Sequence, residues 1–196
     1  MTQTDWEEDN LWKVIAEHEV DQPGTVYGFL GRLAFENGWT TEFARGALLE
    51  YKRFIYLLCR AGHPVTPSVE VDQVWHLHLL YTRDYWDEFA PKLSTRPHHG
   101  PTKGGTSEHS KFKDWYERTL NSYERIFGES PPNCYWPPCS VRFRADQALK
   151  FIDVSGLVII SRNRFFLLLV ILATLLLVSC AVDYLLIQEE GWFSFP

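Results

Sequence analysis

The chain has 196 residues, a formal net charge of −6 at pH 7, and 8 Trp, 9 Tyr and 13 Phe. This length allows one domain and a small additional segment, and the aromatic side chains supply enough apolar surface for a compact core. The mildly acidic balance argues against nucleic acid as a partner. Four cysteines do not make a disulfide framework.

The first 130 residues show helical periodicity interrupted by marked breaks. In the clearest stretch, TTEFARGALLEYKRFIYLLCRAG, apolar side chains recur every three or four residues, from Phe43 to Leu58. We therefore expect an all-α fold, a small orthogonal helical bundle in a domain of residues 1–130. The expected helices cover roughly 4–18, 25–38, 40–62, 66–89 and 107–128.

The segment ESPPNCYWPPCS contains four prolines and is incompatible with regular structure. We expect a Pro-rich linker and juxtamembrane segment over 131–164. Its two cysteines, Cys134 and Cys139, are spaced more widely than in a zinc knuckle. We expect both to be free thiols.

The stretch FFLLLVILATLLLVSCAV, from Phe165 to Val182, has no charged residue over 18 positions. A helix extended to Ile187 rises about 1.5 Å per residue and can cross a hydrocarbon core of roughly 30 Å. We therefore expect a transmembrane helix over 165–187 and a tail-anchored, single-pass protein in contact with the lipid bilayer.

The orientation of this helix follows from its flanks. Arg162 and Arg164 are juxtamembrane basic residues before the span, and no Lys or Arg follows it. The positive-inside rule then places the N-terminal domain in the cytoplasm. Residues 188–196 become a short extracytoplasmic tail.

The stretch VDQVWHLHLLYTRDYW, residues 71–86, carries the chain's most distinctive polar pattern. At about 100° per residue, His76 and His78 point about 200° apart, so one helix cannot aim both at one ion. His78 falls on the apolar face and is expected in the core. Asp72 lies four residues before His76, and the loop RPHHGPTKGG adds His98 and His99.

Two interpretations of Asp72, His76, His98 and His99 remain open. In the first, hydrogen bonds among them fix the Gly/Pro-rich loop to the bundle. In the second, they bind one zinc or iron ion. The second requires ring nitrogens of His76 and of His98 or His99 to converge on one point. We expect no cofactor under the first interpretation, and we identify no catalytic residue because no nucleophile has the spacing of an activated group.

The strings PSVEVDQVWHLHLLYTRDYWDEF, RPHHGPTKGG, WYERTLNSYERIFG and PPNCYWPP resemble the bacterial glycine-rich-domain-like membrane proteins. Plant glycine-rich domain proteins share the D-x-x-W-H-x-H core. The resemblance covers roughly residues 24–143 and implies a helical domain whose family function is largely uncharacterised. It implies no catalytic residues. Many bacterial members carry longer membrane regions and a Gly-rich tail, and we expect neither in this chain.

These observations favour a non-catalytic, single-span accessory or assembly subunit that stabilises a larger membrane protein complex. Its partners would be other membrane protein subunits, with photosynthetic or respiratory complexes as the class that commonly recruits such chains. Its location would be a bacterial inner or intracytoplasmic membrane. The alternatives are a membrane-tethered metal-binding protein or metalloenzyme using His76, His98 and His99, and a soluble-ligand or peptide-binding adaptor using the aromatic face around Trp115 and Tyr116.

Overall fold

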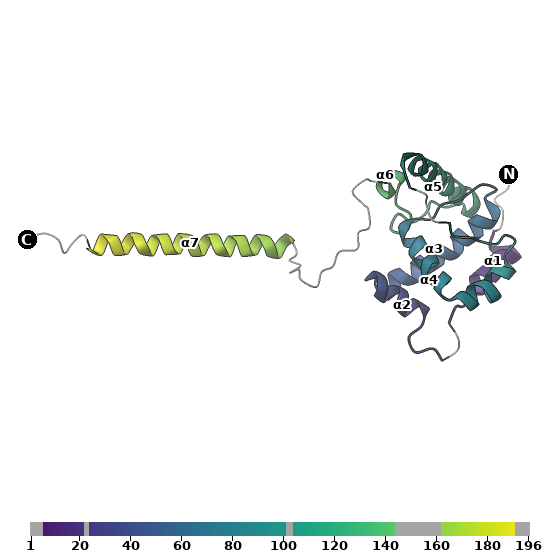
Figure 1. Cartoon of the computed structure of the whole chain (residues 1–196), viewed down its shortest axis with the longest axis horizontal. Coiled ribbons are helices and arrows are strands. Elements are labelled where there is room, and N and C mark those ends of the chain that lie inside the picture. Colours follow the sequence, from purple (N-terminus) through teal and green to yellow (C-terminus); the bar gives the residue numbers. More distant parts are fainter. Residues whose placement is uncertain (1–5, 22–23, 101–103, 144–161, 191–196) are drawn as a thin grey trace, which may run out of the picture. The chain divides into compact units, whose positions relative to one another are not determined.

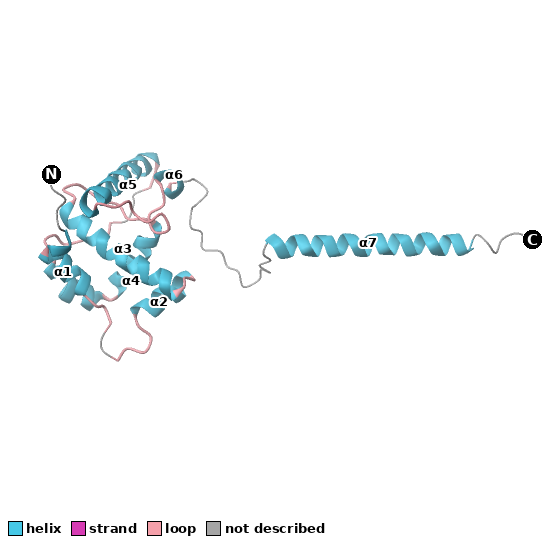
Figure 2. Ribbon diagram, turned by 180° about the vertical axis from the view of Figure 1, so that it is seen from behind, coloured by secondary structure: helices cyan, strands magenta, loops and turns pink. Residues whose placement is uncertain are grey.

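The computed structural model describes residues 6–21, 24–100, 104–143 and 162–190 (Figure 1). Every long regular element in this part of the chain is helical, which confirms an all-α fold and a helical bundle (Figure 2). The chain divides into two units, Met1–Ala148 and Leu149–Pro196. Each unit is described by itself.

The first unit is built around α3, Thr41–Arg60, which contacts the other long helices of the unit. The side chain of Thr40 caps its first turn by accepting a hydrogen bond from the N–H of Phe43. Its neighbours are α1 (Asn10–Glu17), α2 (Phe29–Asn37), α4 (Val69–Leu80) and α5 (Thr106–Phe127). Shorter elements are η1 (Trp6–Glu8), η2 (Asp84–Phe89), η3 (Ala90–Lys92) and α6 (Cys139–Arg142).

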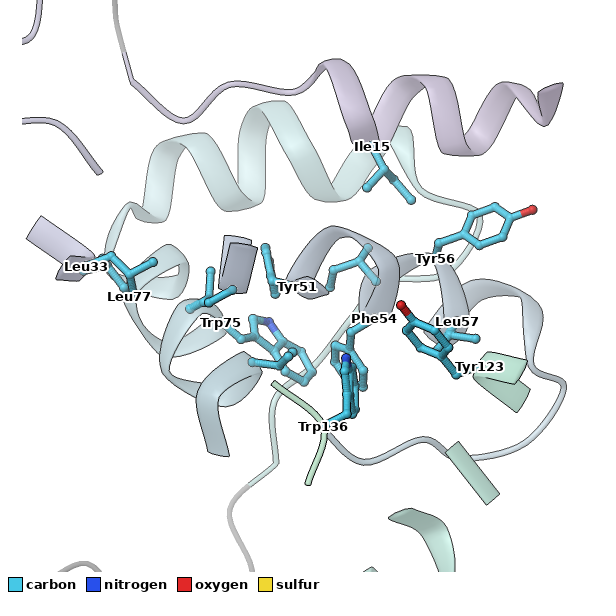
Figure 3. Packing of buried hydrophobic residues seen from close by; sticks show 14 of the residues in the cluster. Ile15, Leu33, Tyr51, Phe54, Tyr56, Leu57, Trp75, Leu77, Tyr123 and Trp136 are labelled. Carbon is cyan, nitrogen blue, oxygen red and sulfur yellow. The ribbon is translucent and has the colours of Figure 1, made fainter. Parts of the chain in front are cut away.

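The core of this unit extends into the Pro-rich segment. Trp136 is 1% exposed and packs against Phe54 and Tyr116. Figure 3 shows Trp136 and Phe54 among the buried side chains. Residues 131–143 therefore belong to the helical unit, whereas the sequence suggested a domain end at 130 and a linker over 131–164. The rest of that linker, 144–161, lies outside the described residues.

The buried carboxylate of Glu50, on α3, binds the Pro-rich segment through a hydrogen bond from Trp136. Glu50 is 3% exposed, and its Oε2 accepts hydrogen bonds from Trp136 Nε1 at 2.8 Å and from the Tyr123 hydroxyl at 3.1 Å. Arg53 contacts Oε1 at 3.2 Å. Burial raises the pKa of Glu50 against the opposing effect of these donors. A buried polar group needs such partners, so the indole of Trp136 has both a packing and a bonding role.

A glycine in α3 allows the same segment to approach closely. A Cβ atom built on Gly46 would lie 1.9 Å from the hydroxyl oxygen of Tyr135. Any larger residue at position 46 would displace the Tyr135 ring, which packs against Phe43. Gly46 therefore lowers local helix propensity but permits the contact between α3 and residues 131–139.

The helix expected over 66–89 is shorter in the structure. Ser68 caps α4 at its start, and α4 ends at Leu80, where Tyr81 leaves helical geometry with φ −84° and ψ 59°. A π-helical segment, η2, follows. The break brings Asp84 Oδ1 to 3.0 Å from His78 Nε2. In a continuous α-helix, residues 78 and 84 would lie about 9 Å apart along the helix axis.

The second unit contains α7, Arg162–Glu190, a helix of 29 residues. Its described apolar side chains between Phe166 and Val178 are exposed. Over the described part of the chain, no helix is both long and apolar enough to cross a bilayer. The transmembrane helix expected over 165–187 is thus not supported by the structure. Residues 191–196 of the expected tail lie outside the described residues.

Candidate metal centre

The two histidines of the HLH string lie in different environments, because α4 turns them to different sides. His78 is 1% exposed and lies among aromatic rings of the core, as the helical geometry predicts. The side chain of His76 is 48% exposed. The two rings therefore cannot share one ion, and each has a separate set of partners.

Asp72, His76 and His99 come together on the exposed side of α4. His99 Nε2 lies 2.8 Å from Asp72 Oδ1 and 3.1 Å from His76 Nε2. His76 Nε2 is 3.7 Å from Asp72 Oδ2. One potential ligand atom from each of the three residues lies within 4.8 Å of the others. The principal partner of Asp72 is therefore His99, although the i, i+4 spacing had suggested His76.

The hydrogen bonding of this cluster depends on which ring nitrogens carry a hydrogen. A neutral imidazole nitrogen is either an N–H donor or an acceptor. If His99 Nε2 carries a hydrogen, that one hydrogen faces both Asp72 Oδ1 and His76 Nε2, and it can bond well to only one of them. An ion in place of this hydrogen would contact all three side chains.

The spacing of the potential ligand atoms also suits an ion. Ligands about 2.0–2.1 Å from a tetrahedral zinc are separated by about 3.3 Å. The contacts of 2.8 and 3.1 Å, and the 3.7 Å contact to the other carboxylate oxygen of Asp72, lie on either side of this value. Two imidazoles and one carboxylate also form the facial set that holds non-haem iron(II) in other proteins.

Tyr85 fixes the loop that carries His99. The Tyr85 hydroxyl donates to the carbonyl oxygen of Pro97 at 2.7 Å and accepts from Trp75 Nε1 at 2.8 Å. Burial raises the pKa of Tyr85 to about 12, so the hydroxyl remains a donor. The Trp75 ring also packs edge-on against His99, with centroids 4.7 Å apart. The position of His99 thus depends on α4 and η2 together.

His98 is separate from the cluster. Its side chain is exposed, and its ring lies beside Trp86 with centroids 5.5 Å apart. Of the four predicted metal ligands, the structure brings together Asp72, His76 and His99. His98 therefore provides a natural control for experiments on its neighbour.

A groove of about 1200 Å³ runs beside this cluster. Asp72, His76 and His99 line one part of it, and the first turns of α5 line another, with Trp115 and Phe112. An ion held by three protein ligands would have its remaining coordination positions accessible from this space.

A second cluster, His18, His78 and Asp84, lies in the interior. Asp84 Oδ1 contacts His18 Nε2 at 2.8 Å and His78 Nε2 at 3.0 Å, and the Tyr51 hydroxyl contacts His78 Nδ1 at 2.8 Å. Desolvation lowers the pKa of His78 to about 4, against the opposing effect of Asp84. His78 is therefore neutral at physiological pH.

Each hydrogen in this second cluster has its own acceptor. Asp84 Oδ1 has two lone pairs for two ring N–H groups, and His78 Nδ1 accepts from the hydroxyl of Tyr51. The Lys52 ammonium also acts on His78, and a nearby cation disfavours a metal ion. The second cluster is thus a satisfied structural network. The sequence did not reveal it, because its members are up to 66 positions apart.

Comparison with known proteins gives one similarity of note. The chain is similar to glycine-rich domain-containing protein 1 of Arabidopsis thaliana, with 25% identity over 99 residues. The match covers 48% of this chain and 12% of the Arabidopsis protein, so this chain spans a small part of that relative's length. No family model and no solved structure matches the chain. The similarity supports a family resemblance to a glycine-rich domain-containing protein.

Proposed function

We propose that the helical unit binds one transition-metal ion, zinc or iron, through Asp72, His76 and His99. The observation that carries this proposal is the convergence of one potential ligand atom from each of these three side chains, all within 4.8 Å of one another. The buried cluster around Asp84 lies near the Lys52 ammonium, which disfavours a metal ion, and the exposed cluster is therefore preferred. The proposed role is binding, with no reaction assigned.

Zinc and ferrous ions suit the donor set in different ways. Two imidazoles and a carboxylate bind zinc in a tetrahedral site whose fourth position is open. The same three groups on one face of an octahedron bind iron(II). The ligands come from one helix and one loop, so metal binding would stabilise the loop that follows Pro97.

Purified full-length chain should bind one equivalent of zinc. Replacing a ligand, in His99→Ala or His76→Ala, should weaken binding by more than about 100-fold, since loss of an outer-shell partner alone costs 10–100-fold. His98→Ala should bind zinc as the wild type does. Competition with a chromophoric chelator measures all four affinities. Equal weakening by His98→Ala and His99→Ala, or no stoichiometric zinc in the wild type, would contradict the proposal.

The Tyr85 hydroxyl should matter for metal affinity, although it touches no ligand atom. Tyr85→Phe removes the bond to Pro97 and loosens the loop, so the zinc dissociation constant should rise about 10–100-fold. Tyr116→Phe is the matched control, because its hydroxyl donates to the carbonyl of Pro137 at the same 2.7 Å distance. The same chelator competition applies. Identical affinities for the two variants would show that Tyr85 does not position His99.

We propose secondly that α7 holds the chain at a membrane as a single span over 165–187. This proposal rests on the uncharged run Phe165–Val182 of the sequence. Arg164 precedes the run and no Lys or Arg follows it, which favours a cytoplasmic helical unit. In this arrangement the chain is a single-span member of the bacterial glycine-rich-domain-like proteins.

Such a chain would serve as an accessory subunit of a larger membrane complex, photosynthetic or respiratory, in a bacterial inner or intracytoplasmic membrane. A small helical unit carrying a metal site and a single apolar helix suits a subunit that stabilises other membrane protein subunits. Recovery of the detergent-solubilised chain only as a free monomer would count against this role.

The membrane proposal predicts that the chain resists extraction from membranes by alkaline carbonate. Leu176→Arg should lower the resistant fraction, because an arginine near the centre of a span costs about 2.5–3.5 kcal/mol. Leu80→Arg is the matched control, since Leu80 is an exposed leucine of α4 in the other unit. Immunoblots of pellet and supernatant measure the distribution. Complete extraction of the wild type would contradict the membrane span.

A further inference from the structure

The groove beside the candidate metal centre has an aromatic wall. Phe112 and Trp115 on α5 are half-buried and contact each other edge-on, with ring centroids 5.6 Å apart. Phe143, after α6, is half-buried and lines the same groove. These rings offer apolar faces to a bound molecule, whereas Tyr116, next to Trp115, is fully buried in the core. The wall is thus distinct from the core-facing side of α5.

Two cationic side chains lie close to the rings of this wall. The Lys111 ammonium lies 4.5 Å from the Phe112 ring centroid and 5.1 Å from that of Trp115. The Arg142 guanidinium lies 5.1 Å from the Phe143 ring centroid. Its Nε is buried, and among the described residues it has no hydrogen-bond partner. Lys111 is paired with Glu108, so the positive charge held against the apolar surface is mainly that of Arg142.

The charges that line the groove favour an anion. Its permanent cations, Arg96, Lys111 and Arg142, outnumber its carboxylates, Asp72 and Glu108. One of these carboxylates belongs to the candidate metal centre, and a bound divalent ion would make the space more positive. Charge of one sign in a cleft concentrates ligands of the opposite sign.

We propose that this groove binds a small organic acid with an apolar body, whose carboxylate reaches the open coordination position of the metal. The inference rests on the proposed metal centre, since the three protein ligands leave room for an oxygen ligand. The apolar body would lie against Phe112 and Trp115. The groove volume of about 1200 Å³ accommodates such a ligand, because small-molecule pockets commonly measure about 300–1,000 Å³.

The test compares an acid with its neutral analogue on the zinc-loaded full-length chain. We expect 3-phenylpropionate to bind at least about tenfold more tightly than 3-phenylpropanol, which is about 1.4 kcal/mol. Isothermal titration, with a detergent blank, gives both affinities. In the cobalt(II)-loaded chain, the acid should change the visible absorption of the metal and the alcohol should not. Equal affinities for acid and alcohol, or an unchanged cobalt spectrum, would overturn the inference.

Variants of the aromatic wall separate this inference from the metal proposal. Trp115→Ala and, as a second variant, Phe112→Ala should weaken acid binding by about tenfold while zinc affinity remains within about twofold. Phe35→Ala removes an exposed ring of α2 that does not line the groove and should change neither. Zinc binding without any effect of the wall variants refutes only the organic-acid site. Absence of zinc binding refutes the metal centre and this inference together.

Discussion

The hydroxyl group of Tyr85 joins the two pieces of chain from which the candidate ligands come. It is buried between the indole of Trp75 on α4 and the carbonyl of Pro97 in the following loop. Asp72 and His76 lie on the helix side of this connection, and His99 lies two residues beyond Pro97. Because both hydrogen bonds share one oxygen atom, the helix and the loop cannot shift independently. The geometry of the cluster is therefore set from inside the core.

The same short segment, η2, also supplies the hydrogen-bond partner of His78 on the buried side of α4. Asp84 at its start accepts from His18 and His78, while Tyr85 faces the loop. A π-helical turn widens the backbone and redirects successive side chains, and such turns occur frequently at functional sites. One break in the helix thus supports both a hydrogen-bonded network in the interior and an exposed cluster of potential metal ligands. The string HLH supplies one histidine to each.

Local pattern in the sequence was enough to predict α3 and the faces of α4. The apolar spacing from Phe43 to Leu58 matches the buried side of α3, and a simple helical projection separated His76 from His78. It also singled out Asp72, His76 and His99, but it could not separate His99 from His98. That choice depends on the bond between Tyr85 and Pro97, which is a tertiary contact.

Other features of the structure could not be predicted from the local sequence pattern. The end of α4 at Leu80 occurs without a glycine or proline at Tyr81, so periodicity alone extended the helix to Phe89. His18 directly follows α1, Tyr51 lies on α3 and Asp84 begins η2, and the three meet only in the folded unit. Four prolines correctly excluded regular structure around Trp136, but composition did not reveal that this indole is part of the core.

The anchoring of residues 131–139 has a practical consequence for dividing the chain into fragments. A fragment cut at the apparent linker, after residue 130, would lose the indole that binds Glu50 and the Pro137 carbonyl that accepts from Tyr116. It would keep every candidate metal ligand, but its hydrophobic core would lack the Trp136 side chain. It would also lack Arg142 and Phe143, so the groove would be missing part of its wall. A minimal fragment for crystallisation or ligand screening should therefore retain the chain at least through Phe143.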